Sequence, residues 1–140
     1  MLQRLIAMPK REAALKRAFT IAMPPEFHML EFATRAAPDR CIVGNGVTTM
    51  WEFKHATPGF DSPGDQELMC MRLAASGHCR YVIWQERESC KKTLIVHPQE
   101  VHNVRHTYGG WSFAPEAFCV GFDIPWLINY VKRTHELRRQ

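Results

Sequence analysis

A hairpin signal near residue 45 constrains the fold of this chain more than any other feature. The dipeptide Asn45-Gly46 lies between a short apolar segment, 40–43, and the segment 47–55, which is rich in β-branched and aromatic residues. Asn-Gly is a preferred pair for a two-residue turn between antiparallel strands, because both positions need positive φ angles. We therefore predict an antiparallel hairpin here, preceded by a further strand over 26–34.

Charged side chains on this hairpin indicate a site. Side chains alternate along a strand, so Glu52 and Lys54 should share one face while Phe53 points to the other. The hairpin also brings Asp39 opposite Glu52. Two carboxylates beside an ammonium are typical of a metal-dependent nuclease, in which oxygen ligands hold Mg²⁺, and the backbone carbonyl of Phe53 is a further candidate ligand. The alternative is a surface ion pair on an edge strand, which is common and nearly neutral in energy.

Helices and further strands surround the hairpin. We predict helices at about 9–23, 65–76 and 124–139, a short helix at 99–105, and two more strands at 79–85 and 92–97. The segment 111–122 is aromatic and irregular. This order predicts an α/β protein with a mixed sheet of about five strands flanked by helices.

The composition is that of a single globular domain. Of 140 residues, 46% are hydrophobic and 11% aromatic, which is enough to bury a core. The net charge of +4 permits a polyanionic partner without demanding one. No apolar run approaches the roughly 20 residues needed to cross a bilayer, so we expect no membrane association. The five cysteines are odd in number and lie mostly in apolar runs, so we expect them to be reduced and buried in a cytoplasmic protein.

Three motifs together resemble a known nuclease superfamily. They are the run Arg35-Ala36-Ala37-Pro38-Asp39-Arg40, the run Trp51-Glu52-Phe53-Lys54, and Gln66 followed by an apolar helix that ends Ala75-Ser76-Gly77. In their order and type they are similar to the PD-(D/E)xK nuclease superfamily, and within it to the VRR-NUC group of small nuclease domains common in phages. The similarity covers about 11–85 and implies a restriction-endonuclease-like core.

The resemblance also implies a catalytic set, a cofactor and a substrate. The implied catalytic residues are Asp39, Glu52, Lys54, Gln66 and Glu12. Glu12 would assist the metal site from the first helix, although a solvated acid near the positive end of the helix dipole is the alternative. The implied cofactor is Mg²⁺ or Mn²⁺, held by Asp39, Glu52 and the carbonyl of Phe53. The implied substrate is DNA, with a preference for flap, nicked or branched forms, in the host cytoplasm if the protein is phage-encoded.

We expect one nuclease domain over 1–140, with a core at about 9–97 and a helical extension at about 98–140. The expected function is a metal-dependent DNA endonuclease that hydrolyses phosphodiester bonds. The alternative is a catalytically silent nuclease-fold protein that binds DNA or a host protein. A chain with one site would need a homodimer for double-strand cutting, and the apolar face of the 124–139 helix offers an interface.

Basic residues and histidines outside the motifs are candidates for DNA contacts and for a zinc site. Basic clusters near the two ends of the chain are candidates for phosphate contacts, which supply most non-specific affinity for DNA, or they form solvated helix faces. They are Arg4, Lys10, Arg11, Lys16, Arg17, Lys132, Arg133, Arg138 and Arg139. His102 and His106 have a spacing that can bind zinc on a helix, but no cysteine pair accompanies them, so zinc is not expected.

Overall fold

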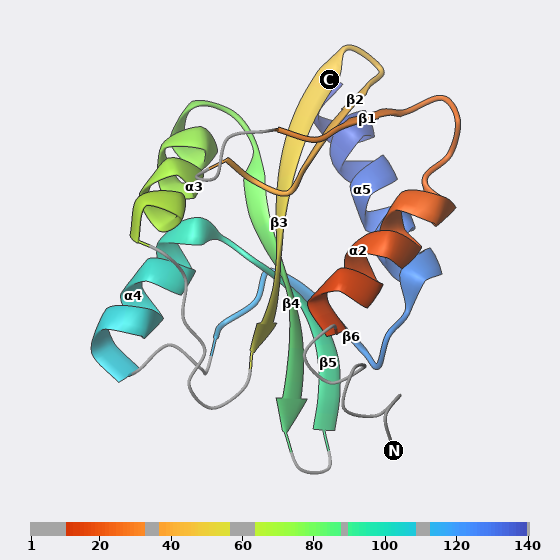
Figure 1. The fold of residues 1–140 in the computed structure, drawn as a ribbon. Helices are drawn as coiled ribbons and strands as arrows, with labels where there is room; N and C mark the ends of the chain where they lie inside the picture. The colour runs from red at the N-terminus through yellow and green to blue at the C-terminus, as the bar shows by residue number, and fades with distance from the viewer. Residues whose placement is uncertain (1–10, 33–36, 57–63, 88–89, 109–112, 140) are drawn as a thin grey trace.

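The described part of the chain forms one six-stranded sheet covered on its two faces by four helices (Figure 1). It comprises residues 11–32, 37–56, 64–87, 90–108 and 113–139 of a computed structural model. The helices are α2 (Arg11–Ala22), α3 (Gly64–Ser76), α4 (Pro98–Tyr108) and α5 (Ile124–Arg139). The strands are β1 (His28–Leu30), β2 (Arg40–Gly44), β3 (Val47–Ala56), β4 (Cys79–Arg87), β5 (Cys90–Val96) and β6 (Ala117–Val120). Helices α3 and α4 lie on one face of the sheet, and α2 and α5 lie on the other.

The sheet is mixed. Its strand order is β1-β2-β3-β4-β5-β6, and all neighbours are antiparallel except β3 and β4, which run parallel. Parallel neighbours need a crossover connection, and α3 lies in it. The predicted α/β class with a mixed sheet flanked by helices is confirmed. The predicted number of about five strands was too low, because 117–120 pairs with β5 inside a segment that we expected to be irregular.

Asn45-Gly46 forms the predicted turn between β2 and β3. Gly44 pairs with Val47, and the two residues between them have φ angles of 55° at Asn45 and 74° at Gly46. Both values are positive, as a two-residue type I′ turn requires. The hairpin prediction is confirmed. The strand before it is shorter than predicted, since β1 covers only His28–Leu30 of the described residues in 26–34.

Two hydrophobic cores lie on opposite faces of the sheet. One core joins α2, β3 and α5, where the rings of Phe19 and Phe53 meet edge to face with 5.1 Å between centroids. The other lies between the sheet and helices α3 and α4, around Tyr81. Leu127 and Val131 of α5 are fully buried in the first core. The apolar face of α5 therefore packs against the sheet, so our prediction that it serves as a dimer interface is wrong.

A buried histidine fastens α5 to the hairpin. The Nδ1 atom of His135 lies 2.9 Å from the carbonyl oxygen of Gly44, and its Nε2 atom lies 2.8 Å from the hydroxyl of Thr49. A carbonyl can only accept, so Nδ1 carries a hydrogen and donates it to Gly44. The indole of Trp51 donates to the same Thr49 oxygen at 2.8 Å. This network ties β3 to the C-terminal helix.

Gly44→Ala should lower the free energy of unfolding by about 1–3 kcal/mol, the usual cost of overpacking a core. A Cβ atom at this position would lie 2.2 Å from Cδ1 of Phe27, a ring that is only 7% exposed. Denaturant titration measures the change. Gly64→Ala is the matched control, because no atom lies within 4 Å of its added Cβ, and its stability should equal or exceed that of the wild type. Equal stability of the two variants would contradict the close packing of Phe27 on Gly44.

The structure describes the side chains of four cysteines. Cys41, Cys70 and Cys79 are buried free thiols, and Cys119 is a half-buried one. The side chain of Cys90 lies outside the described residues. No helix in the described ranges is long and apolar enough to cross a membrane.

Candidate active site

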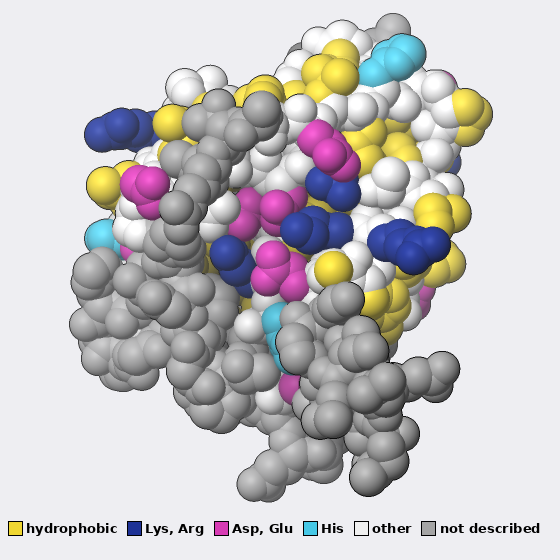
Figure 2. Space-filling view, in the orientation of Figure 1, with side chains coloured by type: hydrophobic (Ala, Val, Ile, Leu, Met, Phe, Trp, Pro, Cys, Tyr) yellow, Lys and Arg dark blue, Asp and Glu magenta, His cyan; other side chains and the backbone are white. Residues whose placement is uncertain are grey.

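Asp39, Glu52 and Lys54 come together where β2 begins and β3 continues past it. Arg40 and Trp51 form the last pair of this ladder, so Asp39 lies beside Glu52. The backbone N–H of Asp39 donates to Glu52 Oε1 at 2.9 Å, and Lys54 Nζ lies 3.4 Å from Glu52 Oε2. Figure 2 shows acidic and basic side chains gathered at the centre of this face, over β3 and α2. The structure thus brings together the three residues expected to form the catalytic centre.

The ladder between β2 and β3 stops here because of Pro38. The pair after Asp39 and Glu52 would join Pro38 to Phe53, and proline has no N–H to donate to the Phe53 carbonyl. The N–H of Phe53 donates instead to Asp39 Oδ2 at 2.9 Å. In an antiparallel ladder the N–H and C=O of one residue point to the same side, so the Phe53 carbonyl also faces Asp39. Two carboxyls and one main-chain carbonyl therefore meet at this edge of β3.

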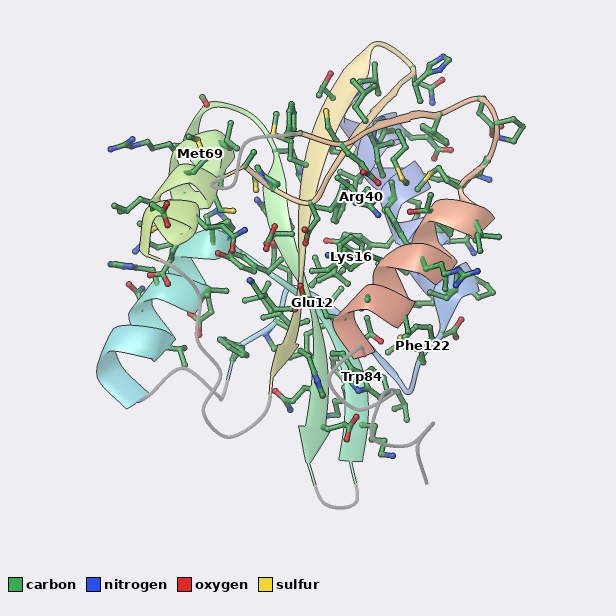
Figure 3. All side chains as sticks on the ribbon, in the orientation of Figure 1. Glu12, Lys16, Arg40, Met69, Trp84 and Phe122 are labelled. Atoms are coloured by element: carbon green, nitrogen blue, oxygen red, sulfur yellow. The ribbon has the colours of Figure 1, made fainter. Side chains whose placement is uncertain are left out.

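Helix α2 adds a second lysine to the site (Figure 3). Lys16 Nζ lies 3.3 Å from Asp39 Oδ1 and 3.8 Å from Glu12 Oε1. Glu12 therefore belongs to the same cluster, connected through Lys16. From the sequence we predicted Lys16 only as a candidate phosphate contact. The signal that could have placed it here is its i+4 spacing from Glu12, which puts both side chains on one face of the helix.

The environment of Glu52 favours its neutral form. Glu52 is 1% exposed, and burial, reinforced by the charge of Asp39, raises its pKa to about 9. Lys54 acts in the opposite direction. The 3.4 Å contact between Lys54 and Glu52 has the geometry of an ion pair, whereas the raised pKa indicates a protonated carboxyl. We take the carboxyl as protonated at neutral pH, because the free-energy cost of removing a carboxylate charge from water exceeds the attraction that the single partner Lys54 provides.

Glu12 shares this electrostatic environment. Its pKa is raised above the usual value, chiefly because the carboxyl is partly removed from water and to a smaller extent because of the charge on Asp39. Lys54 and Lys16 both lower it. Since Lys54 and Asp39 each influence Glu12, the carboxyl group of α2 lies within the field of the β3 site.

Gln66 approaches from α3, on the other face of the sheet. Its side chain is 9% exposed, and its Oε1 atom is buried without a hydrogen-bond partner among the described residues. Cys70, one turn later on the same helical stripe, contributes to the raised pKa of Glu52. The amide thus lies on the side of α3 that faces the site. No hydrogen bond joins it to Asp39 or Glu52 within the described residues.

The oxygen set suits a hard divalent cation. Mg²⁺ keeps several waters and is commonly bound through one or two carboxylates. The raised pKa of Glu52 fits such a site, because a cation could replace the proton that the buried carboxyl otherwise holds. Across the described ranges, no three His, Cys, Asp or Glu side chains are grouped to hold a metal ion. Among the described residues, Asp39, Glu52 and the Phe53 carbonyl, completed by water, could hold such a cation.

His102 of α4 contacts a buried glutamate of α3. His102 Nδ1 lies 2.5 Å from Glu67 Oε1, and Glu67 is a fully buried residue of α3. This contact joins the two helices on that face of the sheet. The side chain of His106 lies outside the described residues.

The sequence matches no protein-family model and no curated protein. The geometry of Asp39, Glu52, Lys54 and their neighbours is therefore what points to a function. The motif resemblance to the PD-(D/E)xK superfamily supports it from the sequence alone.

Proposed function

We propose that this protein is a Mg²⁺- or Mn²⁺-dependent DNA endonuclease with a restriction-endonuclease-like core. The observation that carries the proposal is the Asp39–Glu52 carboxyl pair beside Lys54 at the edge of β3 where its pairing with β2 ends. Burial of the Glu52 carboxyl beside the partly exposed Asp39 carboxyl raises the pKa of Glu52 strongly, and a shift of this kind is typical of functional sites. The motif resemblance to PD-(D/E)xK nucleases points to the same activity.

In this mechanism Asp39, Glu52 and the Phe53 carbonyl would hold the cation. The cation, when bound, neutralises charge on the phosphate and acidifies a bound water. Lys54 orients the attacking water and stabilises the charge that develops on the phosphate oxygens. The water oxygen forms a bond to phosphorus and gives up a proton to solvent as one P–O ester bond breaks, and the leaving alkoxide takes up a proton from solvent. The products are a phosphate monoester and a free hydroxyl.

The test is incubation of the purified protein with supercoiled plasmid, flap DNA and four-way junction DNA in Mg²⁺, Mn²⁺ or EDTA. We expect metal-dependent cutting that Asp39→Asn and Lys54→Ala each reduce by at least about 100-fold, as for removal of one group that stabilises a transition state. Asp39→Asn keeps an oxygen acceptor for the Phe53 N–H and removes the charge. Lys92→Ala, which removes a lysine that lies over the ring of Phe118, is the control and should cut normally.

The alternative function is binding of DNA or a host protein without cutting. Wild-type protein that cuts none of these substrates with either metal contradicts the endonuclease proposal. Equal cutting by wild type and both site variants contradicts it as well, because a contaminating nuclease would then account for the activity. Retained DNA binding without cutting would favour the silent nuclease-fold alternative.

A further inference from the structure

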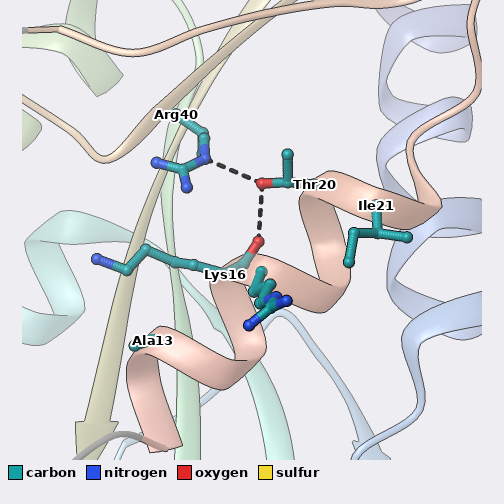
Figure 4. A pocket seen from close by; sticks show the side chains of 6 residues that line it. Ala13, Lys16, Thr20, Ile21 and Arg40 are labelled. Carbon is teal, nitrogen blue, oxygen red and sulfur yellow. Dashed lines mark hydrogen bonds between the residues drawn. The ribbon is translucent and has the colours of Figure 1, made fainter.

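A pocket of about 520 Å³ opens on α2 next to the candidate active site (Figure 4). Lys16, Arg17 and Arg40 supply its charged lining, and Thr20 supplies a hydroxyl. None of the lining residues that the structure describes is acidic. Three cations and a hydroxyl around one hollow form a surface that suits an anion.

Arg40 is held firmly at the wall of this pocket. Its Nε donates to Thr20 Oγ1 at 3.2 Å, its Nη1 donates to the Asp39 carbonyl at 2.9 Å, and its Nη2 lies 3.2 Å from Glu31 Oε1. Thr20 is positioned in turn, because its hydroxyl donates to the carbonyl of Lys16 at 2.8 Å. A guanidinium has five N–H donors. Three of those of Arg40 are engaged by these contacts, which leaves two for another acceptor. Arg40 can therefore bind an incoming acceptor without first being ordered.

Lys16 connects the pocket to the reaction site. Its side chain lines the pocket, and its ammonium lies 3.3 Å from Asp39 Oδ1. Arg40 makes a second connection through the Asp39 carbonyl. If one phosphate of a nucleic-acid strand lies at Asp39 and Glu52, a neighbouring phosphate of the same strand can therefore reach the cationic pocket.

We propose that this pocket binds a backbone phosphate of the cleaved strand adjacent to the scissile one. The inference rests on the proposed endonuclease function and names the part of the substrate that α2 holds. Arg17, which is exposed, contacts the phosphate from the rim, while Arg40 and Lys16 contact it from the wall shared with the site. A phosphate contact of this kind fixes the register of the strand and reads no base sequence.

The basic surface of α5 is a weaker candidate for the same role. It borders a second pocket of about 460 Å³, lined in part by Lys132 and Arg133. That lining also contains the carboxylate of Glu136, which opposes the binding of an anion. No hydrogen bond or ion pair in the described residues joins Lys132 or Arg133 to Asp39 or Glu52. The sequence left the two basic clusters equivalent. The side chains of Arg4, Lys10, Arg11, Arg138 and Arg139 lie outside the described residues, and among the rest only Lys16 both lines a pocket and contacts Asp39.

The test measures binding of a fluorescent DNA duplex in EDTA, by anisotropy, from about 50 to about 200 mM salt. Arg17→Ala should weaken binding equally for duplexes of different sequence and should reduce the slope of log K against log salt by about 1. Arg133→Ala is the matched control, an arginine truncated on the other basic helix, and should leave the slope unchanged. An unchanged slope for Arg17→Ala, or equal changes for both variants, would overturn the inference.

A second measurement locates the contact. Once the cut position is mapped, a neutral methylphosphonate placed one nucleotide to either side of it removes one charge at a time. At one of these positions it should weaken binding by wild type at least as much as Arg17→Ala does, and it should weaken binding by the Arg17→Ala variant less than it weakens binding by wild type. Additive losses at both positions would overturn the inference. A wild type that binds with the predicted salt slopes but never cuts would instead refute the endonuclease proposal and leave the phosphate pocket standing.

Discussion

Glu52→Gln should reduce metal-dependent cleavage by at least about 100-fold while the protein remains folded. At neutral pH the raised pKa leaves the Glu52 carboxyl protonated in the metal-free protein, so a neutral amide of nearly the same shape replaces it with little strain. The amide cannot give up a proton to become an anionic ligand. The variant should therefore lose Mn²⁺ binding, measured by titration calorimetry, together with plasmid cutting.

Glu67→Gln is the matched control for this variant. Glu67 is buried to the same extent as Glu52, at 1% exposed, but it lies on α3 and contacts His102. It should retain both Mn²⁺ binding and cutting. Circular dichroism and thermal melting establish that both variants are folded. A folded Glu52→Gln variant that binds Mn²⁺ and cuts like the wild type would remove Glu52 from the metal site.

The stability of the metal-free protein should fall as the pH rises from about 5 to about 9. The pKa of Glu52 is raised from 4.5 to about 9 in the folded protein, so above pH 4.5 the unfolded chain releases a proton that the folded protein retains. The stabilisation is complete below pH 4.5 and is lost as the pH approaches 9. One proton corresponds to a slope of at most about 1.4 kcal/mol per pH unit. Glu12, whose pKa is also raised, contributes in the same direction.

The difference between wild type and Glu52→Gln isolates this effect, because all other titrating groups are common to both. Urea titrations at a series of pH values in EDTA give the free energy of unfolding as a function of pH. It should decline more steeply with rising pH for the wild type than for the variant. Saturating Mg²⁺ should make the free energy of unfolding of the wild type less dependent on pH, since the cation replaces the proton on Glu52. Parallel curves in EDTA would mean that Glu52 ionises freely in the folded protein.

The hairpin and the position of the carboxyl pair were predictable because they follow from short-range rules. Asn45-Gly46 favours positive φ angles whatever the rest of the chain does. Once that turn fixes the register, strand alternation places Glu52 and Lys54 on one face, and Asp39 must lie opposite Glu52. These steps need no knowledge of distant elements.

The contributions of other elements were not predictable in the same way. The contact between Lys16 and Asp39 depends on how α2 packs against the edge of the sheet, and the spacing of residues along the chain does not determine that packing. The short strand β6 was missed because four residues give too little periodicity, and its identity depends on pairing with β5. The apolar face of α5 indicated burial correctly, but periodicity cannot distinguish burial against the sheet from burial against another subunit.

Pro38 has a consequence for how this site would look in a mutational scan. The Phe53 side chain packs on Phe19 in the core, so substitutions at position 53 report on packing, while the carbonyl that faces Asp39 is present in every amino acid. At position 38 every other amino acid would supply an N–H that could pair with the Phe53 carbonyl and extend the ladder. The site thus depends in part on the backbone N–H that Pro38 lacks. Tolerance of substitutions at position 53 would therefore say nothing about whether the backbone carbonyl of that residue takes part in the site.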